Sequence, residues 1–186
     1  MELASTQPPI AGLKLIELRP FLDERGFFIE HYQAQKFAAL GLPDTFLQDN
    51  HSRSKPHVIR GLHLQLNPAQ GKFVKVIQGR ILDVAVDLRP DSPTFKKHFA
   101  VELSCKNHKA LWIPGGFAHG FCVLGDEPAD VMYKVDAFYD AKSEKGIRFD
   151  DPELGIAWPL KDAIVSKKDL SLPWLKDTQV QSWQWN

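Results

Sequence analysis

Two short segments place histidines among apolar residues, in a pattern that predicts proton-transfer or metal chemistry. Residues 60–65 read RGLHLQ and contain His63, while residues 113–121 read IPGGFAHGF and place His119 after a Pro-Gly turn. An imidazole takes up or releases a proton near neutral pH, and it is also a common metal ligand. Three roles are therefore open for His63: a base, a metal ligand or a hydrogen-bonded core residue. The residues around it must distinguish between them.

The spacing of the histidines argues against a metal site. Pro-x-Gly-x-x-His, residues 114–119, at the start of a strand resembles the second motif of cupins, small jelly-roll barrels that often hold a metal through three histidines and a glutamate. In metal-binding cupins the first motif offers His-x-His, whereas this chain has His63-Leu64-Gln65. A first-row metal needs three or four converging ligands. We therefore expect no metal. The alternative from a different class of protein is a metal-dependent cupin oxygenase or a binding module.

Other polar side chains are expected inside the same barrel. Residues 81–88 alternate, so that Leu82 and Val84 share one face and Asp83 lies on the other. Lys72 and Tyr133 lie in further predicted strands. An imidazole, a phenol, a lysine and a carboxylate in one cavity predict proton transfer, with the lysine stabilising a developing oxyanion.

The elements that must position these residues are mostly strands. Between residues 59 and 137, short runs rich in Val, Ile, Phe and Leu are separated by Gly and Pro turns, which is typical of a β-sandwich or β-barrel. Residues 27–32 predict a further strand and residues 35–40 a short helix. With 186 residues and no linker, the chain is expected to form one domain, residues 1–186, that is mainly β with a few short helices.

Composition excludes several classes of function. The chain has 23 basic and 23 acidic residues and a net charge of zero, so we expect neither nucleic-acid binding nor an electrostatic membrane anchor. No apolar run approaches the length of a membrane span, and the first residues do not resemble a secretory signal. The two cysteines, Cys105 and Cys122, form no metal-binding pair. A cytoplasmic location is the expectation.

The chain resembles the dTDP-4-dehydrorhamnose 3,5-epimerases, cupin-fold sugar-nucleotide epimerases, from about residue 23 to residue 169. Any one of the shared motifs is weak, but the set in this order is specific. The motifs are residues 23–28 (DERGFF), 48–52 (QDNHS), 60–65 (RGLHLQ), 71–76 (GKFVKV), 83–89 (DVAVDLR), 113–121 (IPGGFAHGF) and 166–169 (SKKD).

The resemblance implies a role for each matching residue and requires no cofactor. His63 matches the base that removes a proton next to the sugar ketone, Asp169 the carboxylate that pairs with it, and Tyr133 the general acid on the opposite face. Asp83 remains the alternative partner of His63, because sequence alone does not place Asp169. The matching substrate-binding positions are Arg25, Phe28, Glu30, Gln48, Asp49, Asn50, Arg60, Lys72, His119, Tyr139, Glu144 and Lys168.

The implied reaction inverts C3 and C5 of dTDP-4-dehydro-6-deoxy-glucose, in the route to dTDP-rhamnose. The alternatives are an epimerase of a single centre and a ketoisomerase acting on a related dTDP-sugar. The resemblance also implies a homodimer whose N-terminal strands reach across to the second subunit. One conflict remains: strict alternation puts Arg60 and His63 on opposite faces of a strand, so a bulge or bend is expected at Gly61.

Overall fold

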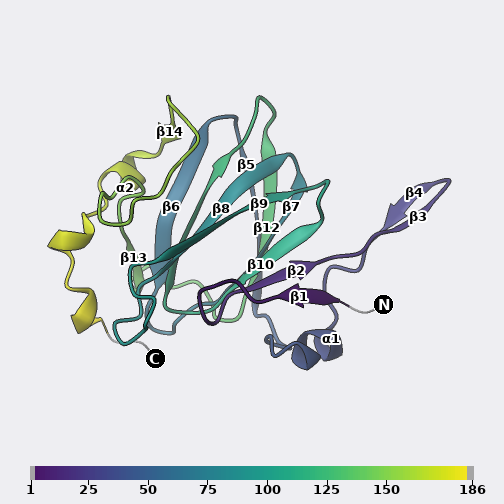
Figure 1. Ribbon diagram of the computed structural model, residues 1–186, viewed down its shortest axis with the longest axis horizontal. Coiled ribbons are helices and arrows are strands. Elements are labelled where there is room, and N and C mark those ends of the chain that lie inside the picture. Colours follow the sequence, from purple (N-terminus) through teal and green to yellow (C-terminus); the bar gives the residue numbers. More distant parts are fainter. Residues whose placement is uncertain (1–2, 184–186) are drawn as a thin grey trace.

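Two antiparallel sheets form the body of the protein in a computed structural model, which describes residues 3–183 (Figure 1). The first sheet has the strand order β1 (Ala4–Thr6), β2 (Lys14–Glu17), β10 (Lys109–Ile113), β7 (Lys72–Gln78), β12 (Ala129–Val135) and β5 (Gln48–Ser54). The second has the order β13 (Glu144–Gly146), β6 (Val58–Gln65), β11 (Phe117–Val123), β8 (Arg80–Asp87) and β9 (His98–Ser104), and β14 (Ile164–Val165) runs parallel to β6. The prediction of a mainly β sandwich is confirmed.

The helices are few and short, as predicted. They are α1 (Ala34–Ala39), α2 (Lys167–Leu170) and the 3₁₀ turns η1 (Leu175–Asp177) and η2 (Val180–Ser182). A six-residue helix is unstable alone. Burial of the Phe37 ring against Phe73 therefore holds α1 on the outer face of the first sheet, with the two ring centroids 4.9 Å apart.

The main core lies between the two sheets, and its side chains come from both of them. Val74 and Val131 point inward from the first sheet, and Ile81, Ala85 and Phe121 from the second. Each large aliphatic or aromatic side chain buried in this way contributes about 1.5–3 kcal/mol. This core fills one end of the sandwich and leaves the other end for polar side chains.

The alternation along β8 is confirmed, and its apolar face lies away from the interior of the sandwich. Val84 and Val86 face away from the main core and contact Leu175 and Val180 of the C-terminal segment. Asp83 faces the space between the sheets, on the same side as Ala85 of the main core. The C-terminal segment thus covers the second sheet, and the carboxylate is directed into the sandwich.

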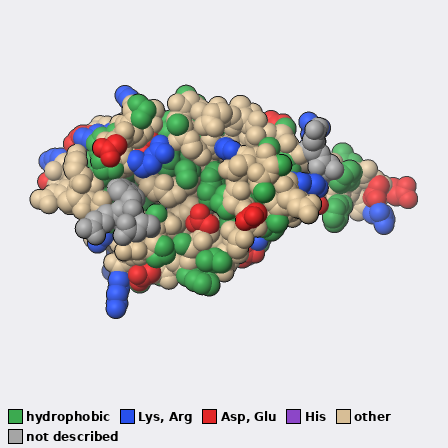
Figure 2. All heavy atoms as spheres, turned by 90° about the horizontal axis from the view of Figure 1, so that it is seen from below, with side chains coloured by type: hydrophobic (Ala, Val, Ile, Leu, Met, Phe, Trp, Pro, Cys, Tyr) green, Lys and Arg blue, Asp and Glu red, His purple; other side chains and the backbone are tan. Residues whose placement is uncertain are grey.

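Residues 27–32 do not form the predicted strand. Instead β3 (Phe21–Asp23) and β4 (Gly26–Phe28) pair as a two-stranded arm that projects from the body (Figure 1). Apolar side chains lie toward the base of the arm, and acidic and basic side chains gather at its tip (Figure 2). Phe27 and Phe28 are 61% and 68% exposed. Phe27 contacts the His108 ring and Phe28 the Phe21 ring, but these contacts leave most of both aromatic side chains uncovered.

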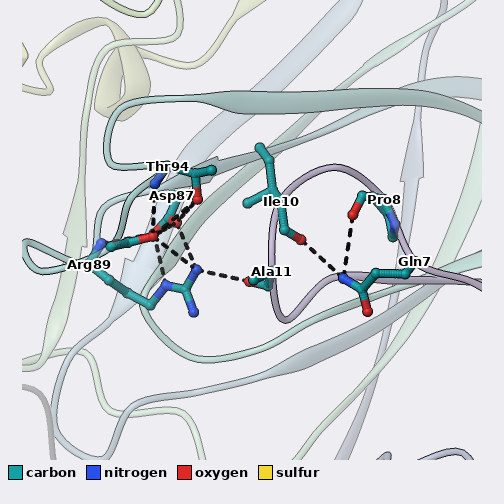
Figure 3. Close-up of polar contacts among 8 residues, drawn as sticks. Gln7, Pro8, Ile10, Ala11, Asp87, Arg89 and Thr94 are labelled. Atoms are coloured by element: carbon teal, nitrogen blue, oxygen red, sulfur yellow. Dashed lines mark hydrogen bonds and ion pairs between the residues drawn. The ribbon is translucent and has the colours of Figure 1, made fainter.

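A polar cluster ties the N-terminal loop to the end of β8 (Figure 3). The Asp87 carboxylate is fully buried and accepts hydrogen bonds from Arg89, Ser92 and Thr94. Burial opposes ionisation, but these bonds outweigh it and keep the pKa of Asp87 below its ordinary value. Arg89 also donates to the carbonyl of Ala11, at 2.9 Å. The cluster thereby fixes the loop that leads into β2.

Candidate active site

A bulge in β6 brings Arg60 and His63 into the same cleft. His119 of β11 pairs with His63, whereas Phe121, two residues later, pairs with Arg60, three residues earlier. The extra residue lies at Gly61, whose φ of +112° favours glycine. A Cβ at this position would lie 2.7 Å from the Gly120 Cα. The bend expected at Gly61 is confirmed.

His63 pairs with Asp169, which the chain brings in from its C-terminal part. The distance from His63 Nε2 to Asp169 Oδ1 is 2.7 Å, and the Gly61 N–H donates to Asp169 Oδ2 at 3.2 Å. Burial alone raises the pKa of Asp169, but the bonds from His63 and Gly61 outweigh it, so the pKa lies below its ordinary value. An ionised carboxylate only accepts. His63 Nε2 therefore carries the proton, and Nδ1 keeps a free lone pair.

The short helix α2 positions this carboxylate. Ser166 caps its N-terminus, because the Ser166 hydroxyl accepts from the Asp169 N–H at 3.0 Å. The preceding strand β14 runs beside β6 (Figure 1). Backbone pairing and a side-chain cap thus bring a residue 106 positions away against His63.

His119 forms a second histidine–carboxylate pair with Asp83. The distance from His119 Nε2 to Asp83 Oδ1 is 2.7 Å, and the Asp83 side chain is fully buried. Asp83 Oδ2 is buried as well and has no hydrogen-bond partner among residues 3–183. Asp83, the alternative partner of His63, therefore holds the neighbouring histidine instead.

Lys72 and Tyr133 add a cation and a phenol to the cleft. Burial lowers the pKa of Lys72 to about 8, partly offset by Asp136, Glu144 and Asp83. The amine is therefore largely protonated at neutral pH. Burial also raises the pKa of Tyr133, so that its hydroxyl keeps its proton.

Three residues form a polar group at the mouth of the cleft. The Tyr139 hydroxyl donates to Glu144 at 2.9 Å, and the Lys168 amine donates to the same carboxylate oxygen at 2.6 Å. Burial raises the pKa of Glu144, but both bonds outweigh it and hold the pKa below its ordinary value. The Tyr139 ring is 54% exposed and available for stacking.

Two glutamines, Gln48 and Gln65, position the loop that carries Tyr139. Gln48 Oε1 accepts from the Tyr139 N–H at 3.2 Å, and Gln48 Nε2 donates to Asn50 at 2.8 Å. Gln65 donates to the Phe138 carbonyl at 3.0 Å and accepts from the Asp140 N–H at 2.8 Å. Gln65, which replaces the second histidine of the metal-binding motif, thus holds this loop. This role was missed because the sequence does not show what lies opposite Gln65.

Within one chain, four of the residues that the resemblance implied do not line this cleft. Asp49 points to the outer face of its strand and pairs with Lys134 at 2.8 Å. Glu30 pairs with Lys36 beside α1. Arg25 and Phe28 lie on the projecting arm, where Arg25 contacts Asp23. The other predicted site residues line the cleft: Gln48, Asn50, Arg60, His63, Lys72, His119, Tyr133, Tyr139, Glu144, Lys168 and Asp169.

The cleft has a volume of about 680 Å³, which suits a nucleotide-sized ligand. It contains a histidine with a free lone pair, a lysine and a phenol, which are the groups that proton abstraction next to a carbonyl needs. Among residues 3–183, no three His, Cys, Asp or Glu side chains come together as a set of metal ligands. In the same part of the chain, no helix has the length and apolar character to cross a membrane.

Comparisons with known proteins identify the family of this chain. The family model for dTDP-4-dehydrorhamnose 3,5-epimerase matches residues 7–177. The dTDP-4-dehydrorhamnose 3,5-epimerase of Shigella flexneri is 47% identical over 92% of this chain and 94% of its own length. These matches cover nearly the whole chain, including the cleft.

Solved structures extend the likeness to the fold. The Legionella pneumophila 3,5-epimerase in complex with dTDP-4-keto-L-rhamnose is 43% identical, with a TM-score of 0.94 over 99% of this chain and 98% of that chain. A 3′-monoepimerase from Streptomyces bikiniensis, bound to dTDP, is 27% identical, with a TM-score of 0.89 over 96% and 92%. The cupin-type fold is thus confirmed, and the chain belongs to the dTDP-4-dehydrorhamnose 3,5-epimerase family of isomerases.

Proposed function

We propose that this protein epimerises C3 and C5 of dTDP-4-dehydro-6-deoxy-glucose to give dTDP-4-dehydro-rhamnose. The observation that carries this proposal is the His63–Asp169 pair at 2.7 Å inside a cleft that also holds Tyr133 and Lys72. The complexes of related epimerases with dTDP-4-keto-L-rhamnose and dTDP support a dTDP-sugar as the substrate.

In this proposal His63 Nδ1 removes the proton from the carbon next to the ketone. The C–H electron pair forms a C=C bond, and the carbonyl electrons move to the oxygen, which becomes an enolate. A proton next to a ketone is removed only where that oxyanion is stabilised. Lys72, held as a cation near neutral pH, supplies this stabilisation, and His119 lines the same cleft beside the sugar. Asp169 keeps the imidazole oriented through its hydrogen bond with His63 Nε2.

Inversion then requires an acid on the opposite face of the sugar. Tyr133 keeps its proton because burial raises its pKa, so its hydroxyl can deliver that proton to the carbon. The enolate collapses to the ketone with the opposite configuration. Repeating the step at the second carbon requires the sugar to present C3 and C5 to His63 in turn, and no redox cofactor takes part.

Proton NMR of the substrate in deuterated water tests the reaction. The wild-type protein should incorporate deuterium at both C3 and C5, and exchange at neither carbon would refute the proposal. Exchange at one carbon alone would select a single-centre epimerase, a possibility that the 3′-monoepimerase relative makes specific. For Tyr133→Phe, exchange should outlast net epimerisation, because His63 still removes the proton while its replacement from the other face is slowed.

We also propose a homodimer in which the β3–β4 arm carries Arg25 and Phe28 into the cleft of a second copy. The support is the high exposure of Phe27, Phe28 and Leu22 on an arm that points away from its own body. Exposed apolar side chains gathered in one place are typical of interaction sites.

The two unpaired cysteines fit a reducing compartment, which supports a cytoplasmic location.

Mixing two inactive variants tests the dimer. In a heterodimer of Phe28→Ala and His63→Ala subunits, the intact arm of the second would meet the intact cleft of the first, and activity should return toward one quarter to one half of wild type. Each variant alone should stay inactive or weak. A lack of recovery in a mixture shown by mass spectrometry to contain heterodimers, or a monomer by light scattering, would contradict the proposal.

A further inference from the structure

One hydroxyl group in the cleft has no partner in the protein. Along β5, the side chains of Gln48, Asn50, Ser52 and Ser54 share the inner face, because every second residue of a strand points the same way. Ser52 Oγ is buried and has no hydrogen-bond partner among residues 3–183. Buried hydroxyl groups are rarely left unpaired, since each costs about 1–3 kcal/mol. The Ser52 hydroxyl is therefore placed to bond to a ligand in the cleft.

The neighbours of Ser52 indicate what that group is. Two residues further along, the Ser54 hydroxyl accepts from Arg60 Nε at 2.9 Å and so anchors the guanidinium. Two residues before it, Asn50 is bonded to Gln48, which holds the loop of Tyr139 at the mouth. Ser52 thus lies between the anchor of a cation and the polar mouth of the cleft. Arg60 and Ser52 both line it.

The chemistry beside Arg60 favours an anion with several acceptor oxygens. A guanidinium fork grips a phosphate through two of its oxygens, and further oxygens stay available to other donors. A serine hydroxyl donates one hydrogen bond. The inner face of β5 carries only uncharged side chains at this point, so nothing on this strand repels an anion placed against Ser52.

We propose that the Ser52 hydroxyl donates a hydrogen bond to an oxygen of the substrate diphosphate, next to Arg60. This inference rests on the proposed function, because it assumes a dTDP-sugar in the cleft. Ser52 would then fix how far the nucleotide enters the cleft. That distance decides whether the sugar carbon reaches His63.

Binding of dTDP and of thymidine to Ser52→Ala separates this role from others. We expect the dissociation constant for dTDP, measured by calorimetry, to rise about tenfold, because hydrogen bonds to charged groups contribute about 1.5–3 kcal/mol and 1.4 kcal/mol is tenfold. The constant for thymidine should stay within a factor of two. Neither measurement depends on turnover, so failure of this inference is distinct from failure of the proposed reaction.

A matched pair of variants tests whether the hydroxyl is unpaired in the free protein. Ser52→Ala should leave the thermal midpoint of the ligand-free protein unchanged or raise it, whereas Ser54→Ala should lower it, because only Ser54 holds a protein partner. A midpoint lowered by Ser52→Ala as much as by Ser54→Ala would overturn the premise. Unchanged dTDP affinity, or equal losses for dTDP and thymidine, would overturn the contact with the diphosphate.

Discussion

The protein holds two histidine–carboxylate pairs with the same hydrogen-bond length and different surroundings. His63 and Asp169 are 2.7 Å apart, as are His119 and Asp83, and the two histidines are direct neighbours across β6 and β11. The His63 side chain is 30% exposed, whereas that of His119 is 9% exposed. The carboxylates differ as well, because Asp169 holds a second bond from the Gly61 N–H and Asp83 Oδ2 has no partner among residues 3–183.

This difference shows that the pair itself does not determine the chemistry. A base must reach the proton that it removes, and then pass it on to its surroundings. His63 has that access from the cleft. His119 is nearly enclosed, so its pair is suited to holding one fixed polar group against a ligand. Access and the second bond to the carboxylate, more than the distance, separate the two roles.

Removing each imidazole gives the largest expected contrast. His63→Ala should lower kcat by about 10⁴-fold and leave the dTDP dissociation constant nearly unchanged, because a base acts in the transition state and not in ground-state binding. His119→Ala should lower kcat less, by about 10²-fold, because it removes a group that lines the cleft beside the base but does not itself remove the proton. Steady-state kinetics and calorimetry measure both effects. Equal losses in the two variants, or a loss of dTDP affinity that matches the loss of rate in His63→Ala, would remove the distinction.

Removing each carboxylate should separate activity from stability. Asp169→Ala should lower kcat by about 10²-fold, because His63 loses the group that orients it. Asp83→Ala should cost more in the free energy of unfolding, about 2–3 kcal/mol, because it leaves a nearly enclosed imidazole without its partner. Urea unfolding of both variants checks this order. The reverse order of stability would mean that the enclosed pair is not the structural one.

Lys72 gives the last expected contrast, as a dependence of stability on pH. Its pKa falls from 10.5 to about 8, chiefly through burial, so the folded state binds this proton less tightly than the unfolded state does. The resulting destabilisation is complete below pH 8 and disappears as the pH rises toward 10.5. At pH 7 this destabilisation is at most about 3 kcal/mol of unfolding free energy. Lys72→Met removes it and should therefore raise the thermal midpoint at pH 7 by several degrees.

The control for Lys72 is the same comparison at high pH. The advantage of Lys72→Met should shrink between pH 8 and pH 10.5, while its turnover stays low at every pH. Calorimetric scans across this range measure the difference. A methionine variant that is less stable than wild type at pH 7 would show that Asp83 and the other carboxylates outweigh burial.

The fold was predicted from the sequence where strands follow a regular alternation. Residues 81–88 alternate between apolar and polar side chains, and their faces came out as expected. Asp83 lies on the inner face, as predicted, and Val84 and Val86 lie on the outer one. The prediction for residues 27–32 failed because aromatic residues predict burial, whereas Phe27 and Phe28 stay mostly exposed in one chain despite contacts with the His108 and Phe21 rings.

The site was predictable only in part. The bulge at Gly61 followed from requiring Arg60 and His63 in one cleft. Asp169 could not be placed from local pattern, because its position depends on the pairing of β14 with β6 far along the chain. Asp49 offered a usable signal, since it alternates with Gln48 and Asn50 and therefore points outward.

The position of Asp169 also has a consequence for the order in which the protein matures. His63 is synthesised early, but its carboxylate lies on α2, near the end of the chain, and the C-terminal segment that follows covers the second sheet. A nascent chain can therefore assemble most of the sandwich while its base is still unoriented. Full activity should begin only when translation has passed residue 169, so a product truncated before that point should be slower than wild type by at least the loss expected for Asp169→Ala.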